Sequence, residues 1–364
     1  MVNNNDKKVL NVPALRFPEF TGEWGNITIK EACSEFQSGK NIKAEMITGQ
    51  GLYPVYGGNG LRGFTESYNH DGDYILIGRQ GALCGNIRKV TGKTYVTEHA
   101  IAVCASKENE TTFLQYLFQK MKLGQYSDQS AQPGLAVNKL LRLNINVPSK
   151  IEQAKIAKIL SLIDERIITQ NKIIEDLKKL KSAIYQELFS NQQGEEYSLS
   201  ELVEIIKGQQ INGNELSENG KYYVMNGGIM PSGYYDDYNT EAGTISISEG
   251  GNSCGYVQYN SSKFWSGGHC YTLHIKPAAP ISTLFLFHFL KWKETDIMTL
   301  RIGSGLPNIQ KKDLSKVSII VPTLNKQQRI MTLLSTFQMK IEHEDMYAIN
   351  LNKQKQYLLS QMFI

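Results

Sequence analysis

Residues 151–190 carry a repeating pattern of apolar positions that is typical of a long helix. The stretch contains no glycine or proline and is rich in lysine, glutamate, isoleucine and leucine. Apolar residues recur at positions a and d of a heptad, which predicts a coiled-coil seam. One set of seam positions is Ile156, Ile163, Gln170, Leu177 and Ile184, and the other, four residues further along, is Leu160, Ile167, Ile174, Lys181 and Leu188.

The C-terminal stretch repeats this pattern, with its polar exceptions at the same places. A helix packed only on its own domain is the simpler interpretation, but about 40 residues make a helix of ~60 Å, longer than one small domain. We therefore expect the two helices to pack on each other in antiparallel orientation, with Gln170 facing Glu344. The corresponding seam positions in this stretch are Ile330, Phe337, Glu344, Leu351 and Leu358, and, four residues further along, Leu334, Ile341, Ala348, Lys355 and Met362.

The whole chain is an internal duplication. The run 74–85 aligns with 244–255, matching Ile, Ile, Gly, Cys and Gly in register, and the same register places His99 on His269. After a short slip the alignment continues to the end of the chain, placing Gln153 on Gln327. These two registers together are the repeat alignment. A period this long indicates duplicated domains and excludes a solenoid of short repeats.

Outside the helical stretches, each copy is rich in glycine, tyrosine, asparagine and serine. Short apolar runs bounded by glycine turns predict strands, and a helix is expected near residues 112–122 and again near 282–293. The expected fold class is α+β, with two similar mixed α/β domains separated by two long antiparallel coiled-coil helices. The predicted boundaries are 1–148 for the first domain, 149–192 for the first helix, 193–322 for the second domain and 323–364 for the second helix.

Composition narrows the class of protein. The chain has 364 residues, 41% of them hydrophobic and 20% charged, which is globular usage. The polar start lacks the apolar core of a signal peptide, so we expect a soluble, cytoplasmic protein. Five scattered cysteines favour reduced thiols over a disulfide framework. The net charge of +4 permits nucleic-acid binding without requiring it.

Motifs for catalysis, nucleotides and metals each lack their required context. Residues 58–63 satisfy GxGxxG, but a polar turn follows where a dinucleotide site needs a helix. Residues 92–94 read Gly-Lys-Thr, but Ile87 stands where a phosphate loop needs its first glycine. A metal site built on His269 and Cys270 fails in the first copy, which has Ala100 in place of Cys270. We expect no catalytic residues, no metal and no cofactor, and a structural role for His99 and His269.

Polar and basic residues on matched glycine-rich loops are the remaining candidates. Arg and Lys can contact guanine, Asn and Gln adenine, and Glu cytosine, so such loops suit the reading of base edges. Solvated loops without function are the alternative for any single residue, and the duplication is what favours the set. The candidates are Lys40, Asn41, Tyr56, Asn59, Arg62, Arg79, Gln80, Tyr95 and Gln132 in the first copy, and Gln209, Gln210, Asn226, Ser248, Glu249, Asn252, Trp265 and Ser304 in the second.

The chain resembles the specificity subunits of Type I DNA restriction and modification enzymes over essentially its whole length. The opening run at 13–20, followed by Gly22-Glu23-Trp24, is similar to the start of such subunits. The segments 147–161 and 321–330 resemble the entry to their spacer helices, and 177–189 and 351–363 resemble the ends of those helices.

The resemblance implies two target-recognition domains, each reading half of a split DNA sequence. Because the matched loops differ, Arg79-Gln80 against Glu249-Gly250, we expect the target to be asymmetric. It also implies partners: two methyltransferase subunits that bind S-adenosylmethionine and, in the full complex, two restriction subunits that use ATP and Mg. The second copy lacks the Arg16-Phe17-Pro18 run and has Gln338-Met339 where the first has Asp164-Glu165. Two alternatives stay open: a non-catalytic coiled-coil adaptor without DNA readout, and a nucleotide-dependent enzyme.

Overall fold

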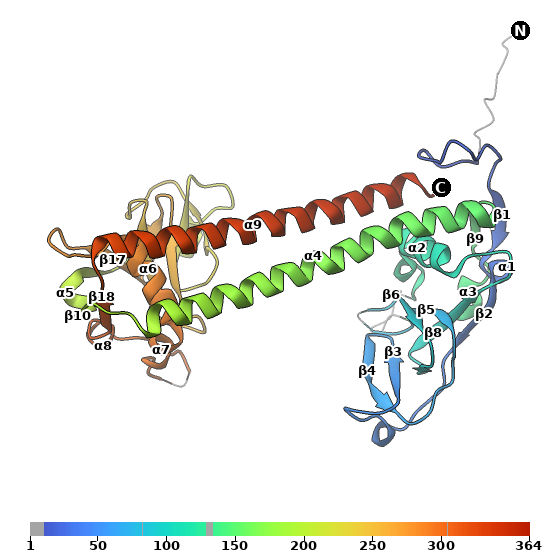
Figure 1. Ribbon diagram of the computed structural model, residues 1–364, viewed down its shortest axis with the longest axis horizontal. Coiled ribbons are helices and arrows are strands. Elements are labelled where there is room, and N and C mark those ends of the chain that lie inside the picture. The colour runs from blue at the N-terminus through green and yellow to red at the C-terminus, as the bar shows by residue number, and fades with distance from the viewer. Residues whose placement is uncertain (1–10, 82, 129–133, 304) are drawn as a thin grey trace, which may run out of the picture. The chain divides into compact units, whose positions relative to one another are not determined.

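The computed structural model divides the chain into two compact units, shown in Figure 1. Unit 1 comprises Met1–Asn171 and Met346–Ile364, and unit 2 comprises Lys172–Asp345. The structure describes residues 11–81, 83–128, 134–303 and 305–364. Each unit is an α+β domain together with one section of each long helix.

The described residues of unit 1 form three sheets, each antiparallel or mixed. The largest is four-stranded, with the order β2-β8-β5-β6, and a three-stranded sheet has the order β4-β3-β7. The strands are β1 (Gly25–Thr28), β2 (Cys33–Ser38), β3 (Tyr53–Gly57), β4 (Gly60–Thr65), β5 (Asp73–Gly78), β6 (Ile87–Thr91), β7 (Tyr95–Val96), β8 (Ala100–Ala105) and β9 (Asn144–Val147), with β1 paired to β9. The helices before the long one are α1 (Ile29–Ala32), η1 (Ala44–Met46), α2 (Thr111–Met121), η2 (Leu123–Tyr126) and α3 (Val137–Leu140).

Unit 2 repeats this plan. Its four-stranded sheet has the order β11-β17-β14-β15, and its three-stranded sheet has the order β13-β12-β16. The strands are β10 (Glu195–Ser198), β11 (Val203–Lys207), β12 (Tyr222–Met225), β13 (Gly233–Tyr235), β14 (Thr244–Ser248), β15 (Val257–Asn260), β16 (Trp265–Ser266), β17 (Cys270–Ile275) and β18 (Ser318–Val321). The helices are α5 (Leu199–Leu202), η3 (Gly213–Glu215), α6 (Thr283–Trp292), α7 (Glu294–Thr299) and α8 (Lys311–Leu314). The helices predicted near 112–122 and 282–293 are α2 and α6.

Two long helices carry the heptads, α4 (Lys150–Ser190, 41 residues) and α9 (Leu324–Gln361, 38 residues). The structure describes all of the predicted a and d positions, and none of them is exposed. The helices pack antiparallel within each unit: Lys355 pairs with Asp164 in unit 1, and Lys178 pairs with Asp345 in unit 2. The pairing predicted between Gln170 and Glu344 would join the two units, and it stays a prediction.

Each domain core takes in the end of one long helix. In unit 1 the ring of Phe363 stacks on Phe113 of α2, with ring centroids 5.2 Å apart. In unit 2 the ring of Phe189 packs edge-on against Phe285 of α6, at 5.8 Å. Phe189 and Phe363 are partners in the repeat alignment. The duplication therefore extends from the sequence into the cores.

A buried glutamine attaches the start of each long helix to its domain. The side-chain amide of Gln153 donates to the carbonyl of Pro148 and to Asn109, and its carbonyl accepts from the backbone of Glu110. Gln327 makes the same kind of link, donating to two proline carbonyls and accepting from the backbone of Ser282. Both glutamines are 1% exposed, so these hydrogen bonds form in a dry environment, where leaving a polar group unpaired is costly.

In unit 1 a segment from the N-terminal part of the chain packs beside the start of α4. Arg16 forms a bidentate ion pair with Glu152, at 2.7 and 2.8 Å, and Glu152 also accepts a long bond from the indole of Trp24. The aligned residue of the second copy is Lys326, so this buried pair has no counterpart in unit 2. Within the described part of the chain, no helix is both long and apolar enough to cross a bilayer.

Candidate nucleic-acid interface

A glycine-rich turn follows strand β5 in unit 1 and strand β14 in unit 2. In unit 1 the backbone nitrogen of Gly85 donates to the carbonyl of Gly78, and in unit 2 Gly255 donates to Ser248. The thiol of Cys84 donates to the carbonyl of Arg79, as Cys254 does to Glu249. The two turns, 78–85 and 248–255, therefore share one backbone hydrogen-bond frame.

The first turn borders a concave pocket of about 430 Å³ in unit 1. Its lining includes three of the predicted DNA-binding residues, Asn59, Arg62 and Gln80. Asn59 comes from the β3–β4 hairpin, Arg62 from β4 and Gln80 from the turn. The full lining is Gly57, Gly58, Asn59, Arg62, Gln80, Gly81 and His99.

The second turn borders a pocket of about 540 Å³ in unit 2. Three predicted residues line it, Asn226, Glu249 and Asn252. This pocket is the counterpart of the first, because the repeat alignment maps one lining onto the other. The aligned pairs that line both pockets are Gly57 and Gly227, Gly58 and Gly228, Arg62 and Ser232, Gln80 and Gly250, Gly81 and Gly251, and His99 and His269.

The two pockets differ in the side chains that aligned positions present. Arg62 is exposed and carries a full positive charge, whereas Ser232 is neutral. Gln80 offers an amide where Gly250 has no side chain. A loop brings Asn308 to the second pocket through backbone pairing with Gly250. The same frame therefore displays different hydrogen-bonding groups in the two units.

The side chain of Glu249 is fixed by hydrogen bonds from two other residues of unit 2. Its Oε1 accepts from Lys207 at 2.6 Å and from the hydroxyl of Tyr271 at 3.2 Å, while Oε2 is buried without a hydrogen-bond partner within the described part of the chain. Nearby, the Nδ1 of His269 is 3.8 Å from Oε2. Burial, and next to it the negative charge of Glu249, raises the pKa of Tyr271 to about 12, so this phenol stays protonated and donates the hydrogen bond. Glu249 thus fixes the wall of the second pocket.

Several other predicted residues serve the fold of the loops. The hydroxyl of buried Ser248 donates to the carbonyl of Gly227 at 2.6 Å, with the carbonyl of Gly250 3.2 Å away. The indole of Trp265 donates to Gln209, and the hydroxyl of Tyr95 donates to Asn41. These bonds leave Asn41 and Gln209 with exposed side chains at the edge of each three-stranded sheet.

The remaining candidates are dispersed. Lys40 and Gln210 are exposed in loops, Tyr56 is half-buried on β3, and Arg79 is half-buried on the first turn without lining its pocket. Gln132 and Ser304 lie outside the described residues. The structure thus brings six predicted residues together, three in each pocket.

The sequence reasoning missed several pocket residues, among them His99, His269 and Lys207. His99 and His269 were expected to be structural, yet both rings line pockets, with side chains 45% and 62% exposed. The alignment of the two histidines was the signal that could have identified them. Lys207 gave no such signal, because it reaches the pocket only through the pairing of β11 with β17, where it lies opposite Tyr271. Among the described residues, no group of His, Cys, Asp and Glu is arranged to hold a metal ion.

Comparison with known proteins assigns the duplicated domain to a family. The family described as "Type I restriction modification DNA specificity domain" matches residues 21–179 and 191–351. The chain belongs to this family. The match agrees with the resemblance to Type I specificity subunits that the sequence showed. The two matched ranges are the two copies of the duplication.

Individual relatives support the family and the fold. The Type I restriction enzyme EcoprrI specificity subunit of Escherichia coli is 40% identical over 153 residues, which cover 41% of this chain and 37% of that subunit. The chain spans about two fifths of the length of the curated relatives that it matches in this way. A crystal structure of the Type I system S subunit from M. genitalium has a TM-score of 0.71 at 22% identity, covering 97% of this chain and 99% of that one. A structure concerned with assembly and conformational transition of the type I system has a TM-score of 0.60 at 16% identity and covers 93% and 97%.

Proposed function

We propose that this specificity subunit reads a bipartite, asymmetric double-stranded DNA target, with one pocket contributing to each half. The observation that carries the proposal is the aligned pair of pockets, which share a backbone frame and differ in their side chains. A shared frame places each pocket against DNA in the same way, and different side chains give different base preferences. The target is asymmetric because Arg62 and Gln80 have no equivalent donors at Ser232 and Gly250.

The chemistry of the first pocket favours purines. Arg62 can donate two hydrogen bonds to the O6 and N7 of guanine, and Asn59 and Gln80 can each pair with adenine in the major groove. In the second pocket Asn226 and Asn252 offer amides, and His269 offers a ring nitrogen. Glu249 acts there through Lys207, whose ammonium it orients with a 2.6 Å hydrogen bond.

The domain assignment follows from the same argument. Residues 1–148 and 193–322 are the two target-recognition domains, and residues 149–192 and 323–364 form the spacer helices. The subunit positions two methyltransferase subunits and, in the full complex, two restriction subunits. S-adenosylmethionine, ATP and Mg belong to those partners. The related structure concerned with assembly of a type I system supports a role in a complex.

Exchange of one domain tests the proposal most directly. Residues 193–322 are replaced by the matching segment of a relative, the hybrid is combined with its methyltransferase partner, and methylated adenines are mapped on genomic DNA. We expect one half of the target to change while the other stays as in the parent. A change in both halves contradicts modular reading. Methylation that ignores sequence in parent and hybrid alike supports the adaptor without DNA readout.

A further inference from the structure

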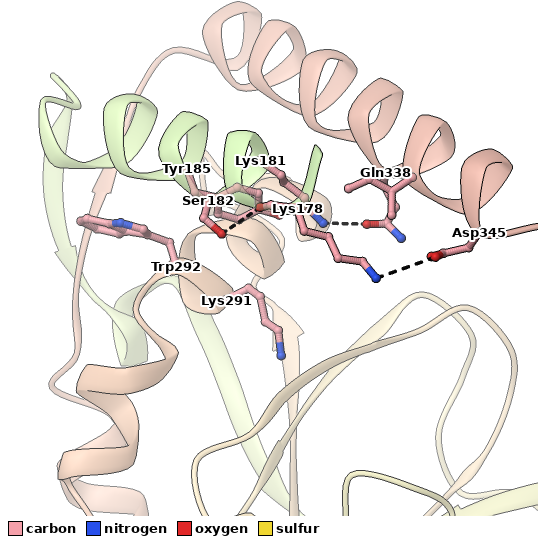
Figure 2. A pocket seen from close by; sticks show the side chains of 9 residues that line it. Lys178, Lys181, Ser182, Tyr185, Lys291, Trp292, Gln338 and Asp345 are labelled. Atoms are coloured by element: carbon pink, nitrogen blue, oxygen red, sulfur yellow. Dashed lines mark hydrogen bonds and ion pairs between the residues drawn. The ribbon is translucent and has the colours of Figure 1, made fainter. Parts of the chain in front are cut away.

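A groove in unit 2 lies apart from the DNA pocket, between the two long helices and α6. Its volume is about 510 Å³. It shares no lining residue with the pocket beside Glu249. Figure 2 shows Lys178 and Lys181 on α4 reaching toward Asp345 and Gln338 on α9. The lining is Lys178, Lys181, Ser182, Tyr185, Lys291, Trp292, Gln338, Ile341 and Asp345.

Lys181 is the cation that the groove leaves unneutralised. Its ammonium donates to the side-chain carbonyl of Gln338 at 2.6 Å, and Gln338 is held in this orientation because its amide donates to Glu342 at 2.7 Å. Among the residues that the structure describes, no carboxylate forms an ion pair with Lys181. Burial lowers the pKa of Lys181, with the charge of Glu342 opposing the shift and that of Lys291 adding to it.

Unit 1 supplies a carboxylate at the same place. The repeat alignment places Lys181 on Lys355 and Gln338 on Asp164. Lys355 pairs with Asp164 at 2.6 Å, and the hydroxyl of Tyr116 donates to the same carboxylate at 2.8 Å. Both lysines also lie over a tyrosine ring, at 5.5 Å from the centroid. The two sites thus share a lysine and a ring, and differ in whether the chain itself neutralises the lysine.

The surroundings of the groove favour a protein carboxylate over a phosphate. Asp345 lies 3.8 Å from Lys178, and Glu294 pairs with Lys291 at 2.5 Å, so a group with two negative charges would meet repulsion. The same sections of the two helices carry exposed apolar residues: Ile173 and Leu180 on α4, and Leu333 and Met339 on α9. Apolar side chains exposed beside an anchoring charge are typical of a surface that another protein covers.

We propose that this groove binds an Asp or Glu side chain of a partner subunit, which pairs with Lys181 and packs its apolar part against Trp292. The partner carboxylate takes the role that Asp164 has in unit 1. The inference rests on the proposed function, since it requires a protein subunit to assemble with this chain. It makes the two helix sections unequal: in unit 1 Asp164 balances the charge of Lys355, whereas in unit 2 the carboxylate for Lys181 comes from the partner.

Carbodiimide cross-linking tests the contact, because it joins a lysine to a carboxylate with which it is in direct contact. The full chain, alone and with its methyltransferase subunit, is cross-linked and analysed by mass spectrometry. A cross-link between Lys355 and Asp164 in both samples is the internal control. We expect Lys181 to be linked to an Asp or Glu of the methyltransferase only in the complex. Methyltransferase that binds and is linked elsewhere, but never at Lys181 or Lys178, overturns the inference and leaves the proposed function standing.

A matched pair of isosteric variants supplies the quantitative test. Gln338→Glu gives Lys181 an internal carboxylate, and we expect it to weaken one of the two methyltransferase binding steps about tenfold, the effect of losing ~1.4 kcal/mol. Asp164→Asn is the control, which changes the same position of unit 1 in the opposite direction and should not weaken that step. The inference is overturned if the Gln338→Glu variant and the wild type bind methyltransferase with equal affinity. If no methyltransferase binds the wild-type chain, the proposed partnership and this inference both fail.

Discussion

The pocket of unit 1 and the pocket of unit 2 have one backbone and two sets of side chains. In both, a cysteine thiol donates to the carbonyl at position 79 or 249. A glycine nitrogen donates to the carbonyl at position 78 or 248. On this frame unit 1 exposes Arg62 and Gln80, whereas unit 2 buries Glu249 behind Lys207. Both copies keep the cysteine and the glycine that make these bonds, so the frame persists while the other side chains of the pocket change.

The difference at position 249 has a specific cause in the neighbouring strand. Tyr271 on β17 supplies the hydroxyl that binds Glu249, and the aligned residue of unit 1 is Ile101, fully buried and without a polar group. A carboxylate at position 79 would therefore have no such donor. The side chains within one domain therefore depend on one another, so we expect exchange of a whole domain to be tolerated better than exchange of position 79 or 249 alone.

Breaking the frame itself should have the largest effect. Gly85 has a φ of +84°, and a Cβ there would lie 2.2 Å from the backbone nitrogen of Gly124. We expect Gly85→Ala to destabilise unit 1 by more than about 3 kcal/mol, measured by hydrogen exchange of β5 and β8 under denaturant. Gly81→Ala is the control, with a φ of +81° but open space around the Cβ, and it should cost only about 1–2 kcal/mol. Equal losses would show that the close approach to Gly124 is unimportant.

Acid should lower the stability of unit 2 more than that of unit 1. His288 is the sixth residue of α6, where α2 has Tyr116. Burial, and to a lesser extent the positive charge of Lys181, lowers the pKa of His288 from 6.5 to about 4. Below pH 6.5 the unfolded chain binds a proton that the folded unit refuses, so the free energy of unfolding of unit 2 falls as pH drops toward 4, by about 3 kcal/mol.

The control for the acid effect is His288→Gln, which keeps an acceptor for the hydroxyl of Tyr185. That hydroxyl is 2.6 Å from the Nδ1 of His288 in the wild type. Urea unfolding at pH 7 and pH 4.5, followed by hydrogen exchange of β14 and β17, measures the loss in each variant. The prediction is wrong if the glutamine variant loses as much stability in acid as the wild type.

A smaller effect is expected from one pocket side chain. Arg62→Ala should relax recognition in one half of the target, because a bidentate contact with a base contributes about 1–3 kcal/mol of discrimination. Ser232→Ala, at the aligned position of unit 2, should change the other half less. Methylation-site mapping with the methyltransferase partner gives both preferences. A uniform loss over unrelated sequences would mean that Arg62 contacts phosphate.

The smallest effects should be equal in the two units. Thr28 and Ser198 each cap a short helix and form a reciprocal capping box, with Glu31 and Glu201 respectively. Replacing either cap by alanine should cost about 1 kcal/mol. Denaturant unfolding of Thr28→Ala and Ser198→Ala measures both. Unequal costs would show that the two copies have diverged in local structure as well as in the pockets.

Much of the fold was predictable because it depends on periodicity. The heptads predicted two long helices, and the polar exceptions at Lys181 and Lys355 proved to be half-buried seam positions with defined partners. The repeat predicted two domains of one plan. The pockets were only partly predictable, because the duplication points to matched loops, and so to residues on them such as Asn59 and Asn226, without showing which side chains meet.

The rest of each site depends on contacts distant in sequence. Lys207 reaches Glu249 only because β11 pairs with β17 in a register that no local pattern specifies. Asn308 arrives through a backbone pairing with Gly250, which lies much earlier in the chain. The neutralisation of Lys355 and its absence at Lys181 likewise required the packing of α4 on α9. Periodicity finds elements, whereas tertiary pairing decides which side chains meet.

The buried glutamines at the starts of α4 and α9 have a mechanical consequence. Gln153 joins the first turn of α4 to the segment that precedes α2, and Gln327 joins the first turn of α9 to the segment that precedes α6. A hinge at either junction would have to break three hydrogen bonds in a dry environment. A rotation of a domain therefore also rotates the first turn of the helix that leaves it, because the junction between them is held by these bonds. Any bending must be spread along the helix itself.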